Sequence, residues 1–281
     1  MNSNKTTRVL FHILSILLVI LFIFPLIWMI VSSLKPEAEV YDNMGSLQAF
    51  LPSNHISEWF GAYESVFSRF SIFRYILNSV FYAFSVTIGS IIVNSLAGYA
   101  FAVLNFRFKK LLFGLMIGLL AIPGETILIT KFVVTQKLGI LDTPLAVILP
   151  LMATPLYIYM FTIFFRAIST ELQESAVLDG ANKFQIYWKI MLPMSKPAVA
   201  TVGTLSFIMS WNDYIWPLMV LTNADRYPLQ VAITNINNTE PVYINQVMAI
   251  LTLSTIPLIL IYVFFQKYLV QGLGASGTGE K

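Results

Sequence analysis

The run from Val9 to Leu34 contains no Lys, Arg, Asp or Glu and consists mainly of Leu, Ile, Val and Phe. A helix of about 20 apolar residues crosses the hydrocarbon of a bilayer, so this run is long enough to span a membrane. It lacks a small-x-small cleavage site before a polar start, which favours an uncleaved helix over a signal peptide. A second uncharged run extends from Tyr75 to Phe106. A chain with two such runs is expected to fold in contact with lipid.

The composition agrees with a membrane protein. Charged residues make up 11% of the chain and hydrophobic residues 57%, whereas about 25% of the residues in a soluble domain are charged. So few charges cannot cover a soluble surface, and so many apolar residues exclude disorder. The net charge of +3 is too small to indicate a nucleic-acid partner. There is no cysteine, and His12 and His55 lie far apart, so we expect no disulfide and no metal site.

Six segments are predicted to cross the membrane, giving an all-α, polytopic protein. We expect one transmembrane domain over residues 1–281, a cytoplasmic loop at about 169–196 and a disordered Gly/Ser-rich tail at about 272–281. No internal repeat is visible. The predicted helices cover residues 9–34, 74–104, 111–130, 145–168, 197–220 and 245–270.

The placement of Lys and Arg predicts the orientation, because these residues are in excess on the cytoplasmic side. With the N-terminus inside, the inner segments hold eleven Lys and Arg residues and the outer segments six. The compact turn from Arg107 to Lys110 contributes most clearly to this difference. Both termini are therefore predicted to be cytoplasmic.

The first outer loop, about Lys35 to Phe73, is long and contains several aromatic residues. These residues are compatible with an amphipathic helix lying at the membrane interface or with a docking surface for an external partner. The sequence leaves both alternatives open. The aromatic residues are Trp59, Phe60, Tyr63, Phe67 and Phe70.

The loop between the fourth and fifth predicted helices carries signals for a helix of its own. Thr170 and Gln173 have the spacing of a capping box, and Glu171 and Glu174 lie where the positive end of a helix dipole favours them. Gly180 can adopt the left-handed conformation that ends a helix. We therefore predict a helix of about two to three turns, outside the membrane, that ends just before Gly180.

The surface of this predicted helix admits two interpretations. Ser175 and Ala176 are small, so the backbone of another protein can approach closely. Alternatively, the helix only covers the bundle. After Gly180, Asn182 is a plausible cap for a second amphipathic stretch, in which four residues at helical spacing are expected to pack under the bundle. They are Phe184, Tyr187, Trp188 and Met191.

The same loop resembles the EAA signature of the permease subunits of ABC importers. That signature is Glu-Ala-Ala, three residues, Gly, nine residues and Ile-x-Leu-Pro. Both spacings match, and one position departs from the pattern, because Ser175 replaces the first alanine. Since serine is also small, close packing is preserved. The matching residues are Glu174-Ser175-Ala176, Gly180 and Ile190-Met191-Leu192-Pro193.

Three further runs are similar to permeases of the carbohydrate-uptake branch, which import maltose, multiple sugars and other oligosaccharides. The similarity covers roughly Arg74 to the sixth predicted helix, and these runs are less specific than the signature. They are Asn94-Ser95-Leu96-Ala97-Gly98-Tyr99-Ala100-Phe101-Ala102, Gly139-Ile140-Leu141-Asp142-Thr143-Pro144 and Trp211-Asn212-Asp213-Tyr214-Ile215-Trp216-Pro217-Leu218.

The resemblance implies a type I ABC importer permease fold in a bacterial cytoplasmic membrane. It implies a heterodimer with a second homologous permease subunit, two cytoplasmic ATP-binding subunits, an extracellular solute-binding protein and an oligosaccharide substrate. The signature helix is then a coupling helix seated in a groove of one ATPase subunit. Residues assigned to coupling are Glu171, Glu174, Ser175, Ala176, Asp179, Gly180, Ile190, Leu192 and Pro193.

The chain contains no Gly-x-x-x-x-Gly-Lys-Ser/Thr loop to bind nucleotide phosphates. We therefore expect that it is not an enzyme, that it binds no cofactor of its own, and that partner ATPase subunits bind ATP and Mg²⁺.

Polar and aromatic residues within the predicted spans are candidates for the substrate path, because intramembrane charges usually face a cavity or a partner. The acidic pair among them can instead lie at the interface, the asparagines can hydrogen-bond helices together, and the tryptophans can belong to aromatic belts. The candidates are Asn94, Tyr99, Glu125, Trp211, Asn212 and Asp213.

Three other functions remain as alternatives. An ABC permease for an amino acid or polyamine would share the mechanism, although the Trp-Asn-Asp-Tyr run argues against it. A secondary transporter would be expected to show internal repeats or titratable residues at mid-membrane. An intramembrane enzyme would need a Ser/His dyad or metal ligands in the bilayer, and only His12 lies in a predicted span.

Overall fold

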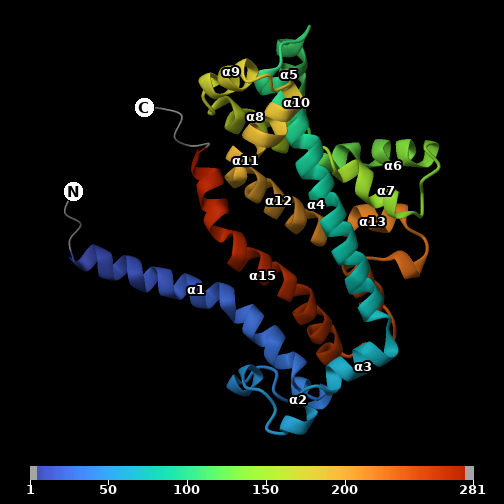
Figure 1. The fold of residues 1–281 in the computed structure, drawn as a ribbon. Helices are drawn as coiled ribbons and strands as arrows, with labels where there is room; N and C mark the ends of the chain where they lie inside the picture. The colour runs from blue at the N-terminus through green and yellow to red at the C-terminus, as the bar shows by residue number, and fades with distance from the viewer. Residues whose placement is uncertain (1–4, 276–281) are drawn as a thin grey trace. The chain divides into compact units, whose positions relative to one another are not determined.

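The structure is a computed structural model that describes residues 5–275, and within that range every regular element is helical (Figure 1). The described chain divides into two compact units. The first unit comprises the residues up to Phe73 together with Ala232–Pro257. The second comprises Arg74–Val231 together with the residues from Leu258 onward.

The first unit is built on α1, whose apolar side chains are largely exposed along its length. Exposed apolar surface of this kind is expected where lipid or another subunit, rather than water, surrounds a helix. The elements are α1 (Lys5–Ser33), α2 (Glu37–Asp42), 3₁₀ turns at Leu47–Phe50 and Ile56–Glu58, α3 (Gly61–Arg69), the last part of α14 (Leu229–Asn237) and the first half of α15 (Ile244–Ala275).

A polar cluster ties the outer loop of this unit to the start of α15. The Glu37 carboxylate accepts hydrogen bonds from the backbone N–H groups of Ile244 and Asn245, at 2.8 and 2.9 Å. A carboxylate at this position satisfies the unpaired N–H groups of a helix N-terminus. Lys35 is buried and donates to the carbonyl of Gln48 at 2.7 Å. The loop is therefore an ordered part of the unit.

The middle of the aromatic stretch of the first outer loop forms α3, which Phe60 and Phe70 flank as its caps. Tyr63 hydrogen-bonds the hydroxyl of Ser33 at 2.7 Å, whereas Phe60 and Phe67 are exposed. Arg69 donates to the side chain of Gln246 at 2.8 Å. One face of α3 is thus packed within the unit and the other remains open to lipid or to a partner.

The second unit contains the remaining elements. They are α4 (Ile72–Val103, mostly in this unit), α5 (Lys109–Gly118), α6 (Leu128–Lys137), α7 (Pro144–Ile148), α8 (Pro155–Arg166), α9 (Thr170–Leu178), α10 (Lys183–Ile186), a π-helical turn at Tyr187–Met191, α11 (Leu192–Met194), α12 (Lys196–Trp211), α13 (Ile215–Val220) and the second half of α15. Short 3₁₀ turns lie at Leu119–Ala121, Gly124–Ile127, Leu149–Leu151 and Ala224–Arg226.

Three of the predicted spans are interrupted. The third bends by 104° between Lys109–Ala121 and Gly124–Lys137, and the fourth bends by 46° between Pro144–Leu151 and Pro155–Arg166. The helix predicted at 111–130 is therefore not continuous, and α6 extends beyond its predicted end. The fifth span is divided into α12 and α13. By contrast, α1, α4 and α15 are each long and apolar enough to cross a membrane.

Proline accounts for these interruptions. Ile122 and Thr154 precede prolines and have extended backbones, because the proline ring disfavours the helical conformation of the preceding residue. Pro217 lacks the N–H that would bond the carbonyl of Asp213, which favours an interruption between α12 and α13. Instead, the Asp213 carboxylate accepts the backbone N–H of Trp216, in the first turn of α13, at 3.3 Å.

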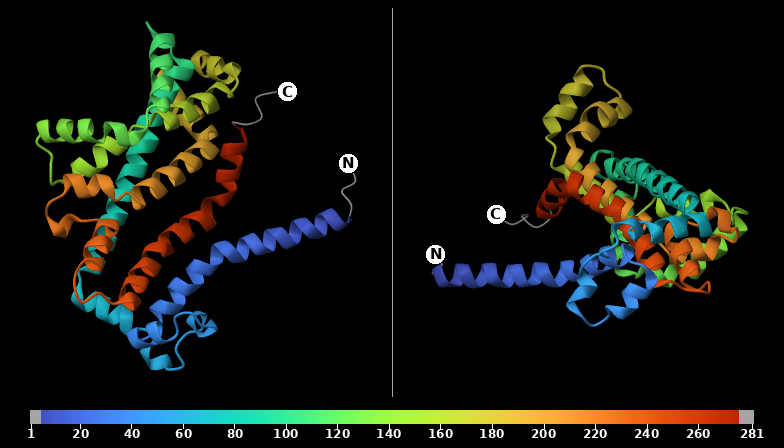
Figure 2. Two further views of the ribbon diagram at one scale, coloured as in Figure 1. Left: turned by 180° about the vertical axis from the view of Figure 1, so that it is seen from behind. Right: turned by 90° about the horizontal axis from the view of Figure 1, so that it is seen from below.

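Loops from the two ends of the bundle bind opposite ends of α4, as Figures 1 and 2 show for the yellow segment around α9 and the orange segment around α13. Near the start of α4, Tyr82 donates to the carbonyl of Arg226 at 2.9 Å. Near its end, Tyr99 donates to the carbonyl of Lys183 at 2.9 Å. This arrangement agrees with the predicted topology, in which these two loops lie on opposite sides of the membrane.

Candidate functional site

The three interruptions converge on one pocket of about 590 Å³ in the second unit, which we call the break pocket. Residues from the third, fourth and fifth predicted spans line it together with α4. They are Val86, Gly124, Glu125, Leu128, Lys131, Leu151, Thr154, Tyr157, Ser206, Met209, Ser210, Asn212, Asp213, Tyr214, Ile215 and Trp216.

Non-helical backbone at membrane depth is tolerated where it is buried in protein or lines a polar cavity, because lipid cannot satisfy its N–H and C=O groups. Binding sites formed by interrupted helices are a known arrangement in transport proteins. Three interruptions around one pocket therefore mark it as a candidate for the translocation path.

The break pocket contains the charged residues Glu125, Lys131 and Asp213. Asp213 is half-buried and holds the start of α13 through its bond to Trp216. The ammonium of Lys131 lies 4.8 Å from the centroid of the Trp216 ring, a cation–π geometry. Glu125 is exposed. Glu125, Asn212 and Asp213, three of the sequence candidates, thus share one pocket.

Asn94, another path candidate, is fully buried and lies outside the lining of the break pocket. Its amide donates to the carbonyl of Met152 at 2.8 Å, and its side-chain oxygen accepts the N–H of Thr154 at 2.9 Å. These backbone groups flank the interruption of the fourth span, so Asn94 satisfies groups that the break leaves unpaired. Of the two interpretations that the sequence left open, these contacts favour helix bonding.

Tyr99 and Trp211 also lie outside the lining of the break pocket. Tyr99 is buried, and its hydroxyl bonds the carbonyl of Lys183 in the cytoplasmic loop. Trp211 is buried and stacks on Phe207, with ring centroids 5.8 Å apart. Both side chains are therefore packing elements in this structure.

The second candidate region is the coupling segment, residues 169–196. Its helix α9 ends in a Schellman motif, in which Gly180 has φ +83°. The N–H of Ala181 bonds the carbonyl of Ala176 at 2.9 Å, and the N–H of Gly180 bonds that of Val177 at 3.0 Å. The predicted helix and its glycine terminator are both present.

The caps of the coupling segment differ from the sequence prediction. Ser169, not Thr170, is the N-cap of α9, and no side-chain bond caps this helix, so the predicted Thr170–Gln173 capping box is absent. The capping box lies instead at the next helix, where Asn182 and Gln185 bond each other's backbone N–H groups at 2.9 and 2.8 Å.

The surface of α9 differs in detail from the expected docking face. Ala176 is buried in the protein's own core, so its small size serves internal packing rather than the approach of another protein. The Ser175 hydroxyl bonds the carbonyl of Glu171 within the helix, at 2.8 Å. By contrast, Val177 and Leu178 are 60% and 89% exposed. These apolar side chains, on a helix predicted to lie outside the membrane, indicate a docking surface.

Of the remaining residues assigned to coupling, some pack inside the second unit and others are exposed. Ile190 and Leu192 pack against the core of the second unit, whereas Glu174, Asp179 and Pro193 are exposed. Of the four residues expected to pack under the bundle, Tyr187 and Met191 are buried, but Phe184 and Trp188 are exposed. That expectation is therefore wrong for two of the four.

Two tyrosines fasten the coupling segment to α4. The Tyr187 hydroxyl bonds that of Ser95 at 2.8 Å, and Tyr99 bonds the carbonyl of Lys183. Sequence reasoning missed this role of Ser95, although its place one turn before Tyr99 in a polar, uncharged motif was a usable signal. Two hydrogen bonds thus tie residues 169–196 to the second half of α4.

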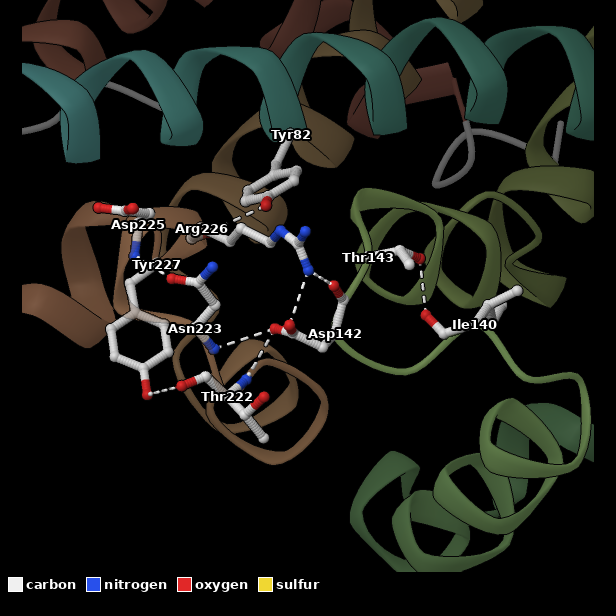
Figure 3. Close-up of polar contacts among 9 residues, drawn as sticks. All are labelled: Tyr82, Ile140, Asp142, Thr143, Thr222, Asn223, Asp225, Arg226 and Tyr227. Carbon is white, nitrogen blue, oxygen red and sulfur yellow. Dashed lines mark hydrogen bonds and ion pairs between the residues drawn. The ribbon is translucent and has the colours of Figure 1, made fainter.

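A polar clasp closes the opposite end of the second unit (Figure 3). The Asp142 carboxylate accepts the backbone N–H groups of Thr222 and Asn223, each at 3.0 Å, and pairs with the guanidinium of Arg226 at 2.7 Å. The N–H of Asp142 itself bonds the carbonyl of Val220 at 2.8 Å. This clasp joins the loop between the third and fourth spans to the loop after the fifth.

The clasp makes the stability of the protein dependent on pH. The backbone N–H groups of Asn223 and Thr222, together with Arg226, hold the pKa of Asp142 below its usual range. A carboxyl group with a lowered folded-state pKa stabilises the protein above its unfolded pKa, and this contribution disappears as pH falls through the folded-state pKa.

We therefore expect Asp142→Asn to lower the thermal unfolding temperature at neutral pH. The gap between wild type and variant should narrow as the pH is lowered through the folded-state pKa of Asp142, because the wild-type carboxylate is then protonated as well. Thermal unfolding of the purified protein in nanodiscs across this pH range measures both effects. If the difference in unfolding temperature between wild type and variant stayed constant at every pH, the charge of Asp142 would not be what stabilises the clasp.

Comparison with known proteins identifies the family to which this chain belongs. The family described as "Binding-protein-dependent transport system inner membrane component" matches residues 90–274, which is more than half of the chain. The chain belongs to this family. It is therefore an inner-membrane transport component rather than an enzyme.

Relatives of this binding-protein-dependent permease match over almost their whole length. The arabinooligosaccharides transport system permease protein AraQ of Halalkalibacterium halodurans is 30% identical, covering 98% of this chain and 99% of the relative. The AraQ protein of Bacillus subtilis is also 30% identical, covering 96% and 95%. The sn-glycerol-3-phosphate transport system permease protein UgpE of Yersinia pestis is 31% identical, covering 93% and 94%.

A solved structure gives the same result for the fold of the permease. A chain from a bacterial ABC transporter involved in the import of the acidic polysaccharide alginate superposes with a TM-score of 0.83 at 25% identity, covering 95% of this chain and 99% of that one. The resemblance to ABC importer permeases is thus confirmed, and so is the all-α permease fold.

Proposed function

We propose that this chain is the permease subunit of an ATP-driven carbohydrate importer and forms half of its translocation pore. The observation that carries the proposal is the convergence of three interrupted spans on the break pocket, in a chain of this family. The arabinooligosaccharide permeases that match over nearly their full length support a carbohydrate as the solute.

The other half of the pore is supplied by a second homologous permease subunit. An extracellular solute-binding protein delivers the solute, and the protein lies in a bacterial cytoplasmic membrane with both termini inside. The family description supports the dependence on a binding protein. The orientation rests on the excess of Lys and Arg in the segments assigned to the cytoplasmic side.

The coupling segment docks on one of two cytoplasmic ATPase subunits, which bind ATP and Mg²⁺. The exposed side chains of Val177 and Leu178 insert into an apolar groove of that subunit, and Glu174 contacts a basic group beside it. Gly180 turns the chain back toward the membrane. Closure of the ATPase subunits moves α9, and the bonds of Tyr187 and Tyr99 pass this movement to α4.

A second candidate is an importer of a phosphorylated polyol. The UgpE relative, a permease for sn-glycerol 3-phosphate, is as similar in identity and coverage as the arabinooligosaccharide permeases. Both candidates share the pore and the coupling mechanism and differ only in the solute.

The test is uptake into proteoliposomes that contain this chain, its companion permease, the ATPase subunits and the binding protein. A panel of labelled solutes should include arabinooligosaccharides, maltooligosaccharides and glycerol 3-phosphate. We expect ATP-dependent uptake of an oligosaccharide. Uptake of glycerol 3-phosphate alone would replace the carbohydrate assignment with the second candidate, and uptake of no solute would overturn the proposal.

A further inference from the structure

We infer that the break pocket admits neutral, hydroxyl-rich solutes and rejects anionic ones; this inference rests on the proposed function. The proteins similar to this chain include a permease for a phosphorylated polyol and a permease chain from an importer of an acidic polysaccharide. The family alone therefore leaves the charge of the solute open.

The charges that line the break pocket oppose the entry of an anion. They are the carboxylates of Glu125 and Asp213 and the ammonium of Lys131, so the pocket carries one net negative charge when all three are ionised. Within the described part of the chain, no ion pair joins Lys131 to either carboxylate. A net negative pocket in a low-dielectric surrounding repels carboxylate and phosphate groups.

Lys131 is the basic group in the lining of the break pocket and would be the group that binds an anion. Its ammonium lies over the ring of Trp216, 4.8 Å from the centroid. Trp216 is fixed in turn, since its indole N–H donates to the carbonyl of Ala146 at 3.0 Å and its side chain is buried. The one cation of the pocket is thus held against its wall.

The hydrogen-bonding groups of the pocket lining also favour a neutral sugar over an anion. Ionised carboxylates only accept hydrogen bonds, so an ionised carboxylate of a solute cannot pair with Glu125 or Asp213. A sugar hydroxyl donates and can bond Glu125 directly. Ser206 and Tyr214, also in the pocket lining, add uncharged hydroxyl groups of the kind that pair with sugar hydroxyls. Asn212 is exposed in the same lining and adds an amide.

The experiment measures binding to the assembled transporter in nanodiscs, without the solute-binding protein, so that its selectivity does not enter. Equilibrium dialysis compares arabinotriose, trigalacturonate and the fully methyl-esterified trigalacturonate, which keeps the rings and removes the charges. We expect the two neutral sugars to bind about tenfold more tightly than trigalacturonate, a factor equal to ~1.4 kcal/mol.

The double variant Glu125→Gln with Asp213→Asn should bring the binding of trigalacturonate to within about twofold of its ester, because the repelling charges are removed. Glu125→Gln alone, at an exposed side chain, keeps the test available if the double variant does not fold. The matched control is Asp42→Asn with Glu64→Gln, which makes the same chemical changes at exposed sites of the first unit and should leave the tenfold difference unchanged.

Three outcomes would overturn the inference: equal binding of trigalacturonate and its ester to the wild type, a difference that survives removal of both carboxylates, or no binding of either neutral sugar. ATP-driven uptake is measured separately. Its loss for every sugar would instead contradict the proposed function, so the two failures are distinguishable.

Discussion

Replacing Gly98 by valine is expected to prevent the second unit from folding correctly. A Cβ at Gly98 would lie 2.6 Å from the Cβ of Phe161, 3.1 Å from the backbone N of Thr162 and 3.2 Å from the carbonyl oxygen of Ile158. These are backbone or near-backbone atoms of α8, so no flexible side chain can move aside. Small residues permit such close helix crossings in membranes.

The expected cost of Gly98→Val is about 3 kcal/mol or more, because α4 and α8 must separate and their core must repack. The measurement is the yield of monodisperse protein in detergent together with its unfolding temperature. Gly114→Val is the matched control, since no atom beyond its chain neighbours and the nearby backbone of α5 lies within 4 Å of the Cβ position at Gly114. Normal yield and stability of Gly98→Val would contradict the close packing of α4 on α8.

Replacing Leu178 by glutamate is expected to uncouple the protein without unfolding it. Leu178 is 89% exposed, so the new charge meets little of the chain's own structure. If Leu178 fills an apolar groove of the ATPase subunit, burying an unpaired carboxylate there removes a central contact, which typically costs about 2 kcal/mol or more. Co-purification of the ATPase subunits and ATP-driven uptake should both fall, whereas the unfolding temperature of the permease should not change.

Leu47→Glu is the matched control for Leu178→Glu. Leu47 is 88% exposed and lies in the first unit, in the loop predicted to be outside the cell. This change should leave co-purification of the ATPase subunits intact. The conservative variant Leu178→Met should retain coupling because it keeps an apolar side chain of similar volume. Full co-purification and uptake by Leu178→Glu would remove α9 from the docking surface.

Local signals in the sequence were sufficient to predict much of the coupling segment. The left-handed Gly180 depends only on its neighbours, and so does the helix before it, because the Schellman motif closes within six residues. The placement of the caps was less predictable. Thr170 had the right spacing to Gln173, but the helix began one residue earlier than the pattern indicated, with Ser169 as its N-cap.

The break pocket could not be predicted from the sequence, because it depends on contacts between distant segments. Pro123, Pro155 and Pro217 indicated kinks, but nothing in hydropathy indicates that the three kinks meet. Asn94 illustrates the difficulty. A buried polar residue in a span suggests a solute path, whereas the partners of Asn94 outside its own helix are backbone groups released by the break before Pro155.

The most direct test of the account is the energy source of uptake. Proteoliposomes with the complete transporter should accumulate the solute identified by the uptake panel when ATP is enclosed, and Glu174→Arg should abolish this accumulation with the subunits still assembled. Imposed proton or sodium gradients without ATP should give no uptake. Uptake that persists without ATP or without the ATPase subunits would contradict the import-permease account and indicate a secondary transporter.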